Sequence, residues 1–317
     1  MDAFNVQDFY NELDKYFAGY DNDATEKFLK DELEKVDNMG MILGVTSSCP
    51  SCNAGKEVEL TDEEKAIICQ RSEARIAILN EMACFYRGIS KWEPCIDTFR
   101  ELMAEMEFSG LEHSEQYAVA VINMAGAYRL VGKFDKALEL FSKADSILKE
   151  INCANDYDWA SLYNNTGLVY QDQNDLQKAL EYFERALDYT RKVQDNEAEL
   201  ATALSNLSLA YYRTGNQEKA DESISESLDI FRALDAGMNP HYAGALNTKA
   251  TYCFLSGDYA QAAELFQQAA EKTKMIFGEN KDYIACCRNC SAALAKAGKD
   301  AEAAQYQALA DEAAKKL

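Results

Sequence analysis

A motif that returns every 41 or 42 residues constrains the fold of this chain more than any other feature. It is most complete from Asn123 to Ala144, where a glycine turn is followed by a small residue and an aromatic one. The turn position recurs at residues 90, 132, 174, 215, 257 and 298. Glycine ends a helix at such a position because it readily adopts a left-handed conformation. Each copy therefore predicts two antiparallel helices, which must stack on neighbouring copies to bury their apolar faces.

The order of Tyr, Gly-x-aromatic, Ala-x-x-x-Phe and Ala, which is complete in the copy at 123–144 and partial in the others, resembles the tetratricopeptide repeat. The period near 42 residues resembles the repeats of kinesin light chains, and so do the connections at 239–243 and 277–285. The resemblance covers about residues 72–317. It implies an all-α fold, a right-handed superhelical solenoid of antiparallel helix pairs. It also implies an interaction scaffold rather than an enzyme, although such a scaffold serves many functions.

Three segments are expected along the chain. Residues 1–38 predict an N-terminal helix pair, and residues 72–317 predict six repeats in a single continuous solenoid. Between them, residues 39–71 are interpreted as an insertion that contains a loop with Cys49-Pro-Ser-Cys52 and the start of the next helix. The helix start is predicted from a capping box, Thr61 to Glu64.

The charge of the chain narrows the classes of partner. The 317 residues carry 32 Lys and Arg against 54 Asp and Glu, a net charge of −22. This balance argues against nucleic acid and against an anionic membrane surface, since both would repel the protein. The sequence starts without a basic and apolar leader, and its ten cysteines fall mostly in apolar helical patterns. We therefore expect a cytoplasmic, reduced protein.

An asparagine column is the most informative candidate site. Most of its members stand nine residues before the turn of their repeat. In two repeats that position holds Glu81 or Thr248, and the asparagine stands one residue before it. The members are Asn80, Asn123, Asn165, Asn206, Asn247 and Asn289. In the tetratricopeptide family this position faces the concave groove, so the resemblance implies an asparagine ladder that pairs with the backbone of an extended peptide. The alternative is that each asparagine bonds the adjacent repeat and has a structural role.

Three arginines could add a cationic strip to the same groove. Arg87 and Arg129 stand three residues before the turn, and Arg213 stands one residue further along its repeat. They could hold an acidic side chain or a phosphate, or they could be solvated surface residues. A carboxylate clamp is not expected, because no basic residue stands four positions before the asparagine column. Those positions hold Val119, Ser161, Thr202, Gly244 and Ala285.

The Cys49/Cys52 pair is a candidate metal or redox site, although an ordinary reduced loop is the preferred interpretation. A zinc site needs two further ligands, and no second pair or nearby histidine follows. Cys253, Cys287 and Cys290 are interpreted as small core residues. The sequence contains no nucleotide-binding, metalloprotease or hydrolase motif, so no cofactor is expected.

Three functional hypotheses remain. The preferred one is a non-enzymatic scaffold that binds a protein or peptide segment, with self-association possible. The second is a peptide-sensing regulator of the quorum-receptor type. Residues 1–64 hold 16 acids and 5 bases, which argues against a DNA-reading head in that region. The third is a thiol or metal protein that uses the Cys49/Cys52 loop.

Overall fold

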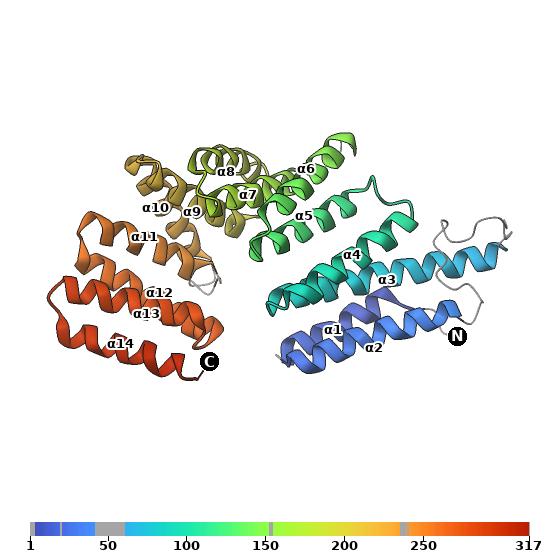
Figure 1. Ribbon diagram of the computed structural model, residues 1–317, viewed down its shortest axis with the longest axis horizontal. Coiled ribbons are helices and arrows are strands. Elements are labelled where there is room, and N and C mark those ends of the chain that lie inside the picture. Colours follow the sequence, from blue (N-terminus) through green and yellow to red (C-terminus); the bar gives the residue numbers. More distant parts are fainter. Residues whose placement is uncertain are drawn as a thin grey trace. The chain divides into compact units, whose positions relative to one another are not determined.

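The chain folds into α-helices throughout the part that the structure describes. The computed structural model describes residues 4–19, 21–41, 61–151, 155–234, 239 and 241–316. Within these residues consecutive helices pack against each other as antiparallel pairs (Figure 1). The helices fall into two compact units, Met1–Ala154 and Asn155–Leu317, called unit 1 and unit 2 below. The predicted all-α fold of helix pairs is confirmed.

The described residues of unit 1 form three helix pairs. The helices are α1 (Val6–Gly19), α2 (Asn22–Met41), α3 (Asp62–Gly88), α4 (Trp92–Phe108), α5 (Glu115–Leu130) and α6 (Phe134–Ile151). The predicted capping box starts α3: the Thr61 hydroxyl accepts the Glu64 N–H, and the Glu64 carboxylate accepts the Thr61 N–H at 2.7 Å. This reciprocal pair satisfies two backbone donors that a helix start leaves without partners.

Unit 2 is built from four helix pairs. Its helices are α7 (Asp156–Asp172), α8 (Leu176–Thr190), α9 (Glu197–Arg213), α10 (Gln217–Ala233), α11 (Tyr242–Ser256), α12 (Tyr259–Phe277), α13 (Lys281–Lys296) and α14 (Asp300–Ala314). Each helix packs on the next one, and α9 also packs on α11, the first helix of the following pair. The first helices of neighbouring pairs therefore lie side by side.

All six predicted turn positions have a left-handed backbone. Four are glycines with φ between 73° and 90°, and the other two are Ser90 with φ 58° and Asn174 with φ 63°. After each turn, an N–H reaches back to the carbonyl five residues earlier, as Lys133 does to Tyr128 at 2.9 Å. This Schellman arrangement closes the first helix of the pair and reverses the chain. The 42-residue period is thus a repeat of one local turn.

In the core of each helix pair, small residues pack against large ones. The predicted small positions of the second helices, such as Ala137, Ala179 and Ala220, are fully buried. Phe183 of α8 lies against Gly167 of α7, where an added Cβ would meet the ring at 2.7 Å. Close approach of the two helices therefore depends on the absence of a side chain at that position.

Several predictions about organisation stay predictions. Helix α2 extends to Met41, beyond the predicted end of the N-terminal pair, and α3 begins at Asp62. Cys49 and Cys52 lie outside the described residues, and so does most of the predicted insertion. A single continuous solenoid is also untested, because units 1 and 2 are described separately. Among the described helices, none is both long and apolar enough to cross a membrane.

Candidate functional site

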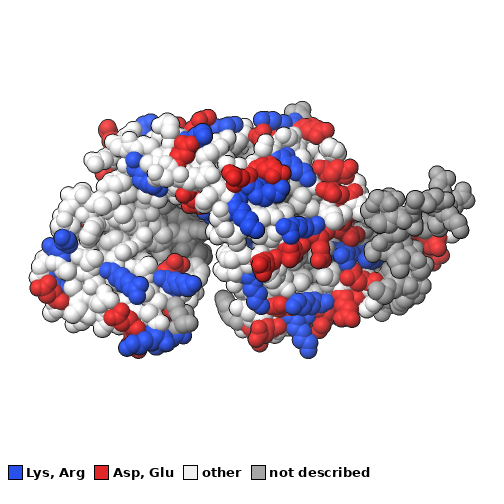
Figure 2. All heavy atoms as spheres, in the orientation of Figure 1, with Lys and Arg blue, Asp and Glu red and all other residues white. Residues whose placement is uncertain are grey.

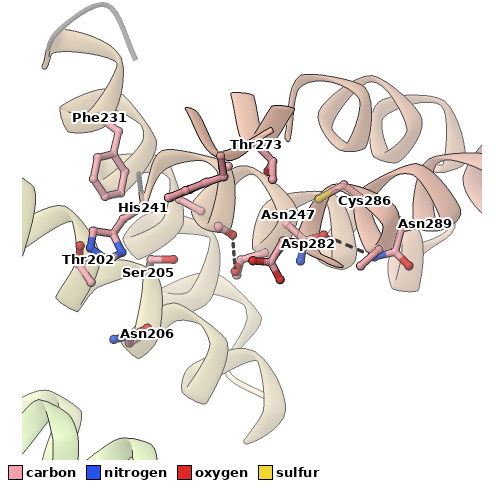
Figure 3. A pocket seen from close by; sticks show the side chains of 16 residues that line it. Thr202, Ser205, Asn206, Phe231, His241, Asn247, Thr273, Asp282, Cys286 and Asn289 are labelled. Carbon is pink, nitrogen blue, oxygen red and sulfur yellow. Dashed lines mark hydrogen bonds between the residues drawn. The ribbon is translucent and has the colours of Figure 1, made fainter. Parts of the chain in front are cut away.

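Unit 2 carries a hollow of about 500 Å³ on the side of its first helices. Side chains of α9, α11 and α13 converge on it, and the ends of α10 and α12 contribute Phe231, Thr273 and Phe277 (Figure 3). The exposed ring of His241, in the connection before α11, lines one edge. The lining is mostly neutral and polar, with buried apolar groups beneath it.

A second hollow of about 400 Å³ continues from the first. It lies on α7 and α9, and it shares Thr202 and His241 with the first hollow. Two shared lining residues make the hollows neighbours along one face of the unit. The two hollows together are called the unit 2 groove, and their combined length spans the first helices of four successive pairs.

Small residues form the floor of the unit 2 groove. Each first helix has a small residue four positions before its place in the asparagine column. This spacing puts the small residue on the same face of the helix as the column. They are Ser161, Thr202, Gly244 and Ala285, and all four line the groove. An added Cβ at Gly244 would meet no atom within 4 Å. These positions, which excluded a carboxylate clamp in the sequence, therefore provide the space for a ligand.

Four predicted asparagines line the unit 2 groove, namely Asn165, Asn206, Asn247 and Asn289. Two of them bond an asparagine of the preceding pair: Asn206 Nδ2 donates to Asn164 Oδ1 at 2.9 Å, and Asn289 Nδ2 donates to Asn247 Oδ1 at 3.5 Å. Asn165 Nδ2 instead donates to the Ser161 carbonyl in its own helix at 2.9 Å. The column is thus a set of amide pairs that joins neighbouring repeats and also faces a cavity.

The other predicted residues lie outside the unit 2 groove. In unit 1, Arg87 Nη1 donates to Asn123 Oδ1 at 2.8 Å, so two predicted residues are brought together as a contact between repeats. Asn80 donates to Glu81 at 3.2 Å, and Arg129 lies half-buried in α5. In unit 2, Arg213 is exposed, and its Nη2 donates to the Asn174 side chain at the turn at 2.6 Å. Ligand binding by these residues stays a prediction.

The sequence did not single out several residues that shape the unit 2 groove. Asn164 and Ser205 stand one position before the column, where the pattern Asn164, Ser205 and Asn247 could have marked a second polar row. Tyr157 and Phe277 line the two hollows with side chains that are 49% and 51% exposed. No repeat signal marks them, because they lie near helix ends where the motif is weakest.

Most of the cysteines described by the structure are buried, whereas Cys69 is exposed. Cys253, Cys287 and Cys290 are buried, which confirms their interpretation as core residues. Burial raises the pKa of the Cys290 thiol to about 12 and that of Cys286 to about 11, so neither forms a nucleophilic thiolate at neutral pH. Among the described residues, no group of three or more His, Cys, Asp or Glu side chains could hold a metal ion. The Cys49/Cys52 hypothesis stays untested.

Comparisons with known proteins agree with the helix pairs. The family model described as "Tetratricopeptide repeat" matches residues 159–233. The chain is 30% identical over 148 residues to response regulator aspartate phosphatase E of Bacillus subtilis, covering 42% of this chain and 39% of that protein. It is 23% identical over 182 residues to protein KINESIN LIGHT CHAIN-RELATED 2 of Arabidopsis thaliana, covering 57% of this chain and 27% of that one. The chain thus spans less than half the length of these relatives.

Solved structures share the fold at low sequence identity. RapI in its apo form covers 99% of this chain and 98% of its own, with a TM-score of 0.64 at 14% identity. The quorum sensor NprR of B. thuringiensis covers 97% and 87%, with a TM-score of 0.57 at 14% identity. BtubC (BKLC) of P. vanneervenii covers 76% and 90%, with a TM-score of 0.54 at 19% identity. Tetratricopeptide repeats are in general scaffolds for protein interaction rather than catalysts. Residues 159–233 therefore match the tetratricopeptide repeat, and the helix pairs share their fold with solved repeat structures that include the repeats of a putative kinesin light chain.

Proposed function

We propose that this protein is a non-enzymatic scaffold that holds an extended peptide segment in the unit 2 groove. The observation that carries the proposal is that four column asparagines line two neighbouring hollows on the same face of unit 2. A cavity of this size, open along successive repeats, suits an extended chain better than a compact small molecule.

The amide pairs leave hydrogen-bonding capacity for a peptide. A carboxamide offers two N–H donors and an oxygen with two lone pairs. Asn206 uses one N–H on Asn164, and no described side chain donates to the Asn206 oxygen. One donor and one acceptor remain, which are the groups that a single peptide unit of an extended ligand needs. The pairing also holds each carboxamide in one orientation, which lowers the entropic cost of binding.

The structural interpretation of the column is compatible with this proposal. The bonds Asn206–Asn164 and Asn289–Asn247 link neighbouring repeats, as that interpretation requires. An exposed or half-buried amide bond contributes about 0.5–1.5 kcal/mol to stability. Removal of an asparagine therefore weakens both the fold and the groove, and a sharper test must leave these bonds intact.

Gly244→Leu provides that test. The substitution replaces a glycine of α11 that lines the hollow, and because an added Cβ there meets nothing within 4 Å, we expect the leucine side chain to occupy the hollow. Gly88→Leu is a matched control, because Gly88 lies in unit 1 and its Cβ also meets nothing within 4 Å. The probes are fluorescein-labelled decapeptides selected from a random library on the purified wild-type protein.

We expect Gly244→Leu to weaken the binding of selected decapeptides at least tenfold in fluorescence anisotropy. Gly88→Leu should change it less than twofold, and both variants should keep the wild-type helical circular dichroism. Peptides that bind Gly244→Leu as tightly as wild type would place the binding site outside the unit 2 groove and would refute the proposal.

A second candidate function is that of a peptide-sensing regulator. It is favoured by the large share of the chain that one structural likeness covers. The fold of the quorum sensor NprR covers 97% of this chain, including the helices of unit 1. In such a regulator, peptide binding in unit 2 would change the structure of unit 1. Hydrogen exchange in α1–α4 should then change when a selected decapeptide binds, whereas a simple scaffold would show protection only in α7–α13.

A further inference from the structure

The fixed charges that line the unit 2 groove are all negative. Glu199 lies in the second hollow and Asp282 in the first. Neither carboxylate makes an ion pair with any residue that the structure describes. The lining residues of both hollows include no Lys or Arg, and His241 is the only other side chain there that can become cationic. A ligand therefore meets two carboxylates that have no ion-pair partner among the described residues.

The cations of unit 2 are placed elsewhere. Arg213 bonds Asn174 at the turn, and Lys249 pairs with Asp221 at 2.6 Å. Arg288 is exposed on α13 and does not line the first hollow. Lys249 is also the only charged residue of α11, and Figure 2 shows a broad surface with few charged side chains over that helix. None of these three cations forms an ion pair with Glu199 or Asp282.

Each hollow combines its carboxylate with a half-exposed aromatic ring. The second hollow holds Glu199 and Tyr157, and the first holds Asp282 and Phe277. Burial raises the pKa of the Tyr157 hydroxyl, and the negative charges of Glu199 and Asp158 raise it further. The ring therefore lies in a negative field.

A hollow that is lined by both a carboxylate and an aromatic ring suits a basic side chain. The aliphatic part of Lys or Arg packs on the ring, and its cation contacts both the ring face and the carboxylate. An acidic side chain or a phosphate would instead be repelled by both hollows. This is the opposite of the anionic ligand that the three predicted arginines suggested.

We propose that the unit 2 groove selects an extended peptide with two basic side chains, one for the hollow of Glu199 and Tyr157 and one for the hollow of Asp282 and Phe277. The inference rests on the proposed function, because it assigns the ligand class of the same groove. The asparagine pairs bind the peptide backbone without regard to sequence, and the two aromatic–carboxylate hollows supply the selectivity.

The test uses three fluorescein-labelled decapeptide pools of net charge +3, 0 and −3 with equal apolar content. We expect half-saturation by the +3 pool at a concentration at least tenfold lower than by the −3 pool. Because a chain of net charge −22 attracts any basic peptide, the variants decide whether the groove is responsible. Glu199→Gln/Asp282→Asn should weaken the binding of the +3 pool at least tenfold.

The matched control is Glu264→Gln/Glu271→Gln, which removes the same charge from exposed positions of α12 outside the groove. It should change binding less than threefold. If neutral or acidic pools bind as tightly as the +3 pool and Gly244→Leu still blocks them, the ligand class is refuted but the peptide groove stands. If no pool shows binding that Gly244→Leu blocks, the proposed function fails and this inference fails with it.

Discussion

Two glycines in first helices of unit 2 should respond to the same substitution with opposite signs. At Gly167 an added Cβ would lie 2.7 Å from both Cδ1 and Cε1 of Phe183, a ring that is 1% exposed. At Gly244 the added Cβ would meet nothing within 4 Å. Neither glycine has a positive φ, so alanine is compatible with the backbone at both sites.

The magnitudes follow from two competing contributions. Replacing Gly by Ala in a helix interior stabilises a protein by about 1 kcal/mol. At Gly167 this gain is opposed by overpacking against a ring that has no room to move, which costs about 1–3 kcal/mol. Gly244 is the third residue of α11, where the gain is smaller than in a helix interior, so we expect Gly244→Ala to raise the free energy of unfolding by about 0.5 kcal/mol. Gly167→Ala should lower it by up to about 2 kcal/mol.

Urea unfolding monitored by tryptophan fluorescence measures both changes. The chain has two tryptophans, so a Trp92→Phe background leaves Trp159 of α7 as a reporter for unit 2. The double variant Gly167→Ala/Phe183→Leu should recover much of the lost stability, because the smaller side chain removes the clash. Equal shifts of the urea midpoint for Gly167→Ala and Gly244→Ala would refute the packing argument.

Two further predictions concern unit 1. Lys30 and Lys91 hydrogen-bond Glu26 and lower its pKa to about 2, so the stabilisation is complete above pH 4.5 and is lost as the pH falls toward 2. Because both lysines are largely exposed, Glu26→Gln should cost only about 1 kcal/mol at pH 7 and should flatten the dependence of the urea midpoint on pH in this range. Ser90 has φ 58°, so Ser90→Gly should stabilise unit 1 by about 0.5–1 kcal/mol, measured by urea unfolding with Trp92 as the reporter.

The fold could be predicted from the sequence because its determinants are local. Ser90 and Asn174 replace glycine at the turn, yet their spacing still identified them as turn positions with a left-handed backbone. The capping box at Thr61 was equally readable, since both of its hydrogen bonds span three residues. Neither feature depends on which helices pack together.

The candidate site could be predicted only in part, because it depends on which side chains meet across repeats. The column position placed Asn206 on the groove, but its bond to Asn164, 42 residues earlier, is a tertiary contact. Arg87 shows the same limit: its repeat position suggested a ligand contact, whereas in the fold it donates to Asn123. Glu199 and Tyr157 line the same hollow but do not stand at corresponding repeat positions, although both lie near the starts of helices.

The asparagine column explains why one residue type can serve both structure and binding in a repeat protein. Two charged residues in the same place would either neutralise each other or bind only ligands of one charge sign. An amide pair such as Asn289 and Asn247 uses one donor and one acceptor to join the repeats and keeps the remainder for a ligand. Selectivity must then come from other residues of the cavity. In unit 2 the residues with that capacity are the carboxylates and rings at the helix ends, outside the repeating motif.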